Sequence, residues 1–112
     1  MALAVQFTAN LVDLRRAVLR LTMRLGDESP IGKGFVILRV VLKRLTIETV
    51  NSSEELSIGV HQAGTVTVPV AVFCALANTL GYHRGRRIRF RISSGSIGMD
   101  RTVIRHPGIS VT

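Results

Sequence analysis

Three arginines in the first quarter of the chain are spaced for phosphate chemistry. Arg16, Arg20 and Arg24 lie at i, i+4 and i+8, which places them on one face of a helix. Like charges at this spacing destabilise a helix by roughly 0.2–0.5 kcal/mol per pair, and only Asp13 on the predicted helix can offset them. Guanidinium groups bind phosphate oxygens in bidentate fashion without reading a base sequence. The spacing therefore favours a polyanionic partner, with a solvated helix face as the alternative.

The opposite side of this predicted helix is apolar. Five aliphatic side chains fall within about 80° of arc at 100° per residue and form the expected core face. Arg15 flanks this stripe and joins the candidate nucleic-acid-binding set, Arg15, Arg16, Arg20 and Arg24. The five core residues are Leu11, Leu14, Val18, Leu21 and Leu25.

A second basic cluster follows in the last third of the chain. Residues 87–92 alternate arginine with isoleucine or phenylalanine, so a strand here would place its arginines on one sheet face and its apolar side chains on the other. We expect this face to protect the sheet and keep it soluble. Contact with DNA or with an acidic partner is the alternative. The cluster consists of Arg84, Arg86, Arg87, Arg89 and Arg91.

Residues that could bind a nucleotide triphosphate or a metal are poorly arranged. The segment GDESPIGKG at 26–34 resembles a P-loop, but its glycine spacing is one residue too long and Gly34 replaces the magnesium-binding Ser or Thr. His61, His83 and His106 are far apart and have no His or Cys partner at ligand spacing. We expect no metal site and no cofactor.

Catalytic side chains are also difficult to find in the sequence. Glu54 and Glu55 follow a predicted turn and are interpreted as solvated charges, not as a paired acid and base. Cys74 lies in the middle of a predicted helix and is interpreted as a small packed residue. We therefore expect a binding protein and not an enzyme.

Charge and composition point to the same class. Fifteen basic side chains, thirteen of them Arg, oppose seven acidic ones, which gives a net charge of +8. Such a balance favours nucleic acid as partner, with an acidic membrane surface second.

The longest apolar run, 68–77, is about half of a membrane span, and the N-terminus lacks the pattern of a signal peptide. One cysteine fits the reducing cytoplasm. The 112 residues suit one domain.

The elements that must position these residues repeat one pattern. A strand at 3–7 leads into a helix that Thr8 or Asn10 caps and Gly26 ends. Three strands follow, the first two joined by a tight hairpin at 42–44. These strands are expected at 35–41, 45–50 and 55–61.

The same order then starts again in the second half. A strand at 65–68 meets Pro69, which suits the first turn of a helix over 70–80, and Gly81 ends that helix. Three strands complete the pattern. They are expected at 86–92, 96–100 and 102–106, so the two halves span about 2–61 and 65–106.

Four segments carry a resemblance to a known family. The stretches VQFTANLVDLRRAV, FVILRVVLKRLTIETV, GTVTVPVAVFCALANTL and RRIRFRISSGSIGMD occur in the order found in one domain of the bacterial DNA polymerase III sliding clamp, the beta subunit. The resemblance covers nearly the whole chain. It implies an α+β, DNA-clamp-like domain of two βαβββ units, with two helices packed on one side of a curved antiparallel sheet. An unrelated α+β domain with a proline-started helix is the alternative.

The resemblance also implies a function. Clamp helices face a central hole and contact double-stranded DNA through its phosphates, so the chain is expected to bind DNA without sequence specificity as a replication processivity factor. A clamp chain carries three such domains and this chain carries one. A ring of six domains would then need six copies joined head to tail through edge strands, a homo-oligomer. The second helix also lacks the cations of a ring-lining helix.

Two other functions remain open at this point. The chain could be a non-ring interaction protein that mimics a clamp domain and binds a clamp, a clamp loader or a polymerase. It could also be an unrelated α+β protein whose basic sheet face binds RNA. The last alternative is weakest, because stacking requires exposed rings and four of the five aromatic residues are expected in the core. The five are Phe7, Phe35, Phe73, Phe90 and Tyr82.

Overall fold

Two helices and ten strands make up the described part of the chain, which comprises residues 4–28, 34–49 and 52–112 of a computed structural model. The α+β class is confirmed. The first βαβββ unit and its additional short strand comprise β1 (Ala4–Asn10), α1 (Leu11–Glu28), β2 (Phe35–Val41), β3 (Arg44–Glu48), β4 (Ser53–Ser57) and β5 (Gly59–Gln62). The second comprises β6 (Gly64–Pro69), α2 (Val70–Tyr82), β7 (Arg87–Ser93), β8 (Ser96–Met99), β9 (Thr102–Arg105) and β10 (Ser110–Val111).

The antiparallel strands are divided between two five-stranded sheets, ordered β5-β1-β7-β8-β9 and β10-β6-β2-β3-β4. The first strand of each unit joins the sheet that is formed by the three consecutive strands after the helix of the other unit. Thus β1 pairs with β7, where Phe7 lies opposite Phe90, and β6 pairs with β2, where Val66 lies opposite Leu38. Because of this exchange, each sheet needs strands from both halves of the chain.

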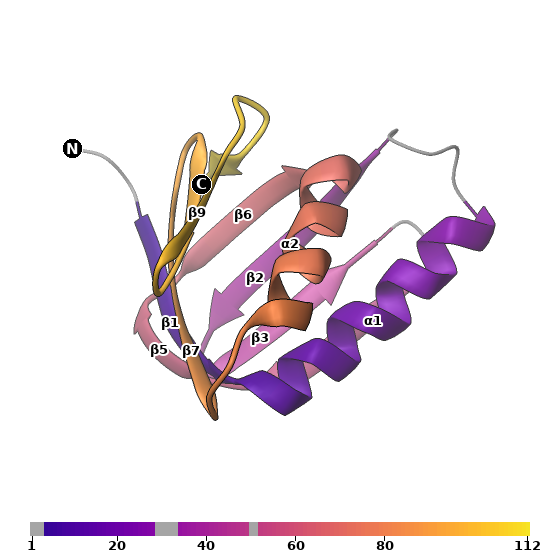
Figure 1. Cartoon of the computed structure of the whole chain (residues 1–112). Coiled ribbons are helices and arrows are strands. Elements are labelled where there is room, and N and C mark those ends of the chain that lie inside the picture. Colours follow the sequence, from indigo (N-terminus) through magenta and orange to yellow (C-terminus); the bar gives the residue numbers. More distant parts are fainter. Residues whose placement is uncertain (1–3, 29–33, 50–51) are drawn as a thin grey trace.

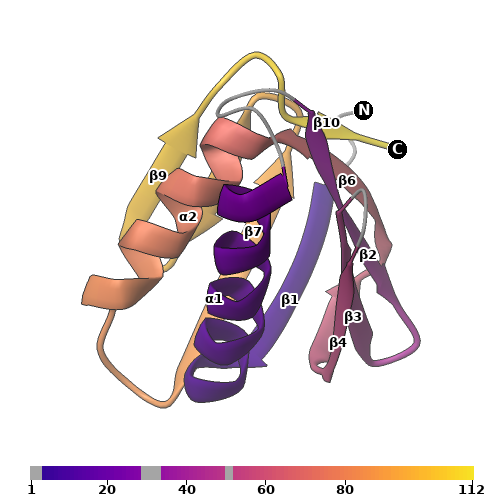
Figure 2. The same ribbon diagram turned by 90° about the vertical axis from the view of Figure 1, so that its right-hand side faces the viewer.

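The two helices lie side by side on the same side of both sheets (Figures 1 and 2). Their apolar faces and alternate positions of the strands form one core of buried aliphatic and aromatic side chains. On α1 the predicted core residues Leu11, Leu14, Val18 and Leu21 are buried, and the side chain of Leu25 lies outside the described part. The rings of Phe7 and Phe90 stack across the sheet with their centroids 4.8 Å apart.

Each helix begins directly where a strand ends. The first amide of α1, on Leu11, donates to the carbonyl of Arg86 at 2.9 Å, and the first amide of α2, on Val70, donates to the carbonyl of Gly34 at 3.1 Å. Both acceptors immediately precede the strand that pairs with the incoming one, so the sheet ladder continues into the helix start. At α1 the side chain of Asn10 also accepts from the amide of Asp13 at 3.1 Å, an N-cap bond.

At the helix ends, one proline and two glycines do not have the positions that the sequence predicted for them. Pro69 is not in the first turn of α2; it is the last residue of β6 and the N-cap, with φ −61° and an extended ψ of 149°. Its missing amide still costs nothing, because the amide of Val70 makes the bond at the junction. The helices also continue past the expected glycine stops, Gly26 and Gly81, to Glu28 and Tyr82.

The predicted third strand of the first half is broken at one residue. The sequence alternates through 55–61, but β4 pairs with β3 in one sheet and β5 pairs with β1 in the other. Ile58 lies between them; its side chain is buried and its amide donates to the carbonyl of Lys43 at 2.9 Å. The chain therefore crosses between sheets at Ile58. A matching short strand near the C-terminus, β10, was not expected from the sequence.

The tight hairpin between β2 and β3 is confirmed. Its two central residues, Leu42 and Lys43, both have positive φ, at 50° and 63°, as a type I′ turn requires. The prediction that four of the five aromatic residues lie in the core is wrong by one, because Phe35 at the start of β2 is 58% exposed and Tyr82 is 88% exposed. Within the described ranges, neither helix combines the length and apolar character that a membrane crossing needs.

Candidate nucleic-acid interface

Three of the four predicted arginines share the exposed side of α1. Arg16, Arg20 and Arg24 are all exposed, at the spacing that the sequence indicated. The Nε of Arg20 also forms an ion pair with the carboxylate of Glu54 on β4. The prediction considered only acidic residues on the helix itself, and the structure adds an acidic side chain from the sheet that reaches the middle of the row.

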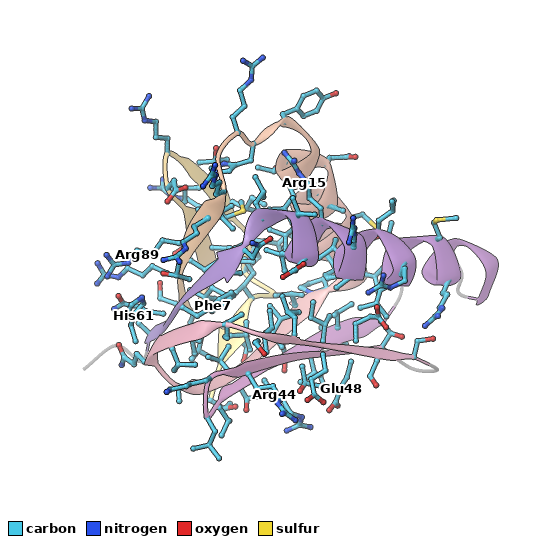
Figure 3. All side chains as sticks on the ribbon, turned by 90° about the horizontal axis from the view of Figure 1, so that it is seen from below. Phe7, Arg15, Arg44, Glu48, His61 and Arg89 are labelled. Carbon is cyan, nitrogen blue, oxygen red and sulfur yellow. The ribbon has the colours of Figure 1, made fainter. Side chains whose placement is uncertain are left out.

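Arg15 has a different position. Its guanidinium points from α1 toward the C-terminal end of α2 (Figure 3), where Nε donates to the carbonyl of Leu80 at 2.6 Å and Nη2 donates to the carbonyl of His83. Leu80 lies in the last turn of α2, which has no basic residue of its own, and His83 is the C-cap of the helix. Arg15 thus neutralises the negative end of the second helix. The structure places it in the packing of the two helices and not on the exposed row.

Apolar side chains occupy the same exposed side of α1. Val12, Leu19 and Met23 are 49%, 60% and 65% exposed. Their spacing of seven and four residues puts them in one stripe beside Arg16. The helical spacing of these three residues in the sequence already indicates such a stripe. The exposed side of α2 adds Ala71, Ala75 and Asn78 and has no charge, as expected.

The second basic cluster separates into two parts. Arg87, Arg89 and Arg91 are exposed on β7, opposite the buried Ile88 and Phe90. Figure 3 shows Arg89 projecting near His61 on the side of the sheet away from α1, and its Nη2 lies 3.5 Å from Oε1 of Gln6. This part matches the predicted outward sheet face.

The other members of that cluster do not lie on the outward sheet face. Arg86 contributes its carbonyl to the start of α1. Arg84 lies in the connection after α2, where it lines a pocket with residues of the β8–β9 turn. The sequence could not separate these roles, because they depend on where the end of α2 meets the neighbouring sheet.

The two glutamates expected to be solvated both form ion pairs. Glu54 contacts Arg20, and Glu55 on β4 contacts Arg44 on β3. A third pair joins Glu48 to Arg39 at 3.0 Å across the β2–β3 hairpin. All three pairs are at least partly exposed, so each contributes at most about 1 kcal/mol. Glu54 and Glu55 lie on the edge strand β4, whereas Glu48 lies on β3, and each carboxylate has an arginine partner.

The comparisons with known proteins bear on the fold. No protein-family model matches the sequence, and no curated protein sequence matches it. Among solved structures, a beta sliding clamp from C. crescentus superposes on 97% of this chain with a TM-score of 0.72. The fold is that of a sliding-clamp domain. The two sequences are only 12% identical, and the chain covers 30% of the length of that clamp.

The exposed residues define which surfaces of this chain are available to bind a partner. Its helix side presents the arginine row and the apolar stripe together, and the opposite side of the first sheet presents the arginines of β7. In the described part of the chain, β4 and β9 each pair with one strand only and form one edge of each sheet. This chain therefore has a helix surface with both arginines and apolar side chains, a basic sheet surface and exposed strand edges.

Proposed function

We propose that this chain binds double-stranded DNA without sequence specificity, as a sliding-clamp-like processivity factor. The supporting observation is the exposed row of Arg16, Arg20 and Arg24 on a helix of a clamp-like fold. Arg16 and Arg24 can contact phosphates directly, and Arg20 can join them by exchanging its ion pair with Glu54 for a phosphate. These contacts displace counterions and give affinity with no base readout. Arg15 is left out of this interface because the end of α2 occupies its guanidinium.

The proposal includes assembly of several copies into a ring around DNA. One chain covers 30% of the length of the C. crescentus clamp, so enclosing DNA requires more than one copy. Head-to-tail association through unpaired strand edges gives a heterologous interface, which closes when the rotation between copies permits it. DNA would then be retained topologically, and the arginine contacts would be weak enough to permit sliding.

The edges β4 and β9 are complementary on both sides of the sheet. On the core side, half-buried Leu56 of β4 and Ile104 of β9 both pack against the core at an open edge. On the outer side, Glu55 of β4 is acidic and is paired with Arg44 of the same chain, whereas Arg105 of β9 is basic. Pairing β4 of one copy with β9 of the next would continue the ladder, join the two aliphatic side chains and place opposite charges together.

A salt titration of duplex affinity tests the DNA contact. Arg16, Arg20 and Arg24 are changed together to Gln, and the control changes Arg87, Arg89 and Arg91 together to Gln, so both variants lose three charges. The slope of log K against log salt is negative, and each lost phosphate contact should reduce its magnitude by about 0.9. The proposal expects a larger reduction in this magnitude for the α1 variant than for the control. Equal slopes for the two variants would contradict it.

A second function is favoured by one specific observation. Val12, Leu19 and Met23 form an apolar stripe on the helix side, which suits contact with a protein better than contact with phosphates. The chain would then be a non-ring interaction protein that binds a clamp, a clamp loader or a polymerase. Changing Leu19 and Met23 to Ser would abolish capture of such a partner and leave duplex affinity unchanged.

Under either function we propose a cytoplasmic binding protein without catalytic activity or cofactor.

A further inference from the structure

A pocket of about 640 Å³ lies where the end of α2 meets the turn between β8 and β9. We call it the α2 pocket. It is separate from the arginine row of α1, and duplex binding through that row does not use it. Its volume is in the range of small-molecule sites. The side chains that matter for its chemistry are Tyr82, His83, Arg84, Asp100 and Arg101.

The charges of the α2 pocket favour an anionic ligand. Arg84 and Arg101 are both exposed at its wall, and Asp100 is the one acidic residue in the lining. The carboxylate of Asp100 is already engaged, because its Oδ2 lies 3.0 Å from Nε2 of His83 and its Oδ1 accepts from the backbone amide of Arg89 at 3.4 Å. Two arginines therefore line the pocket together with one carboxylate that already has other partners.

The negative end of α2 would normally repel an anion at this place. Here the carbonyls of Leu80 and His83 accept hydrogen bonds from the guanidinium of Arg15. The helix end beside the pocket is thus neutralised from the opposite side, by a residue of α1. An anion next to Arg84 would not face exposed carbonyls of Leu80 and His83.

An exposed aromatic ring lies beside these cations. Tyr82 is 88% exposed, although it lies on a helix whose other large side chains are buried. Exposed aromatic rings next to arginines are the arrangement on which bases of nucleic acids stack, with a contribution of about 1–3 kcal/mol per base. The hydroxyl of Thr102 at the start of β9 adds a polar group to the same wall.

We propose that the α2 pocket binds one nucleotide unit, with the base stacked on Tyr82 and the phosphate held by Arg84 and Arg101. Single-stranded nucleic acid and free nucleoside phosphates are two sources of this same chemistry. The site is a feature of the α2 end and the β8–β9 turn, so it stands whether or not α1 binds duplex DNA.

The test measures binding of a labelled oligo(dT) of about 12 nucleotides by fluorescence anisotropy, at about 50 mM salt. Tyr82→Ala should weaken binding about tenfold, as loss of one stacked base predicts, and Tyr82→Phe should stay within about twofold. Arg84→Gln and Arg101→Gln should each weaken binding more than Lys43→Gln, which removes one exposed charge on the β2–β3 hairpin. Circular dichroism melting checks that each variant is folded.

Competition with free dTMP identifies the source of the ligand. Displacement of the oligonucleotide by dTMP would support a pocket for free nucleotides, and binding of oligo(dT) without displacement would support a pocket for a strand. Unchanged binding in Tyr82→Ala, or equal losses in the two arginine variants and Lys43→Gln, would overturn the proposal. Absence of binding to both oligo(dT) and dTMP by the unaltered protein would also overturn it.

Discussion

The guanidinium of Arg15 on α1 donates a hydrogen bond to the carbonyl of Leu80 on α2 at 2.6 Å. A second bond from the same group reaches the carbonyl of His83. This single side chain satisfies two carbonyls at the end of one helix from the exposed margin of the other. The two helices are thereby joined at the end where the α2 pocket opens.

Replacing Arg15 should destabilise the fold without weakening duplex binding. Arg15→Met keeps the length of the side chain and removes two hydrogen bonds from a charged donor, which should cost about 1.5–3 kcal/mol. The measurement is the free energy of unfolding in urea, with Arg16→Met on the exposed row as the control. Equal stability of the two variants would contradict the capping role of Arg15.

Two glycines should respond in opposite directions to the same substitution. A Cβ at Gly108 would lie 2.5 Å from Cγ of Pro69, whose ring is fixed to the backbone at the start of α2. Gly108→Ala should therefore destabilise the protein by about 1–3 kcal/mol. Gly81 is helical and a Cβ there meets nothing within 4 Å, so Gly81→Ala should stabilise by about 0.5–1 kcal/mol. Thermal melting of both variants checks the prediction, and a shift of the same sign in both would refute it.

Much of this fold could be predicted from local patterns. The alternation at residues 35–41 and 87–92, the core face of α1 and the direct passage from strand to helix after Pro69 all occur as the sequence indicates, because each depends on near neighbours in the chain. The crossing at Ile58 could not be predicted in this way. An alternating pattern continues unchanged when its partner strand changes from β3 to β1.

The candidate sites were less predictable than the fold, because their chemistry depends on contacts between distant segments. Arg15 and Arg20 look equivalent to Arg16 in the sequence, yet one bonds the end of α2 and the other pairs with Glu54. Arg84 looks like part of the basic strand and lies instead in the α2 pocket with Arg101. By contrast, the stripe that contains Val12 and Leu19 could have been found from its helical spacing alone.

The proposed contact between β4 and β9 makes a prediction about charge. Glu55→Arg should prevent head-to-tail association, since it would face Arg105 of the next copy, and Arg105→Glu should do the same by facing Glu55. A chain that carries both substitutions should associate again, because the opposite charges are restored in exchanged positions. Sedimentation velocity of the three variants measures this. Failure of the doubly substituted chain to associate, in a folded state, would exclude this pairing of edges.

Solution mass tests the central claim most directly. Light scattering across a range of protein concentrations, at low salt, distinguishes one chain of 12.2 kDa from six chains, which amount to six times 12.2 kDa or about 73 kDa. The account predicts a stable species near the larger mass that persists on dilution, as a closed ring would. A monomer or dimer at every concentration would contradict self-assembly into a clamp and leave the interaction protein as the better explanation.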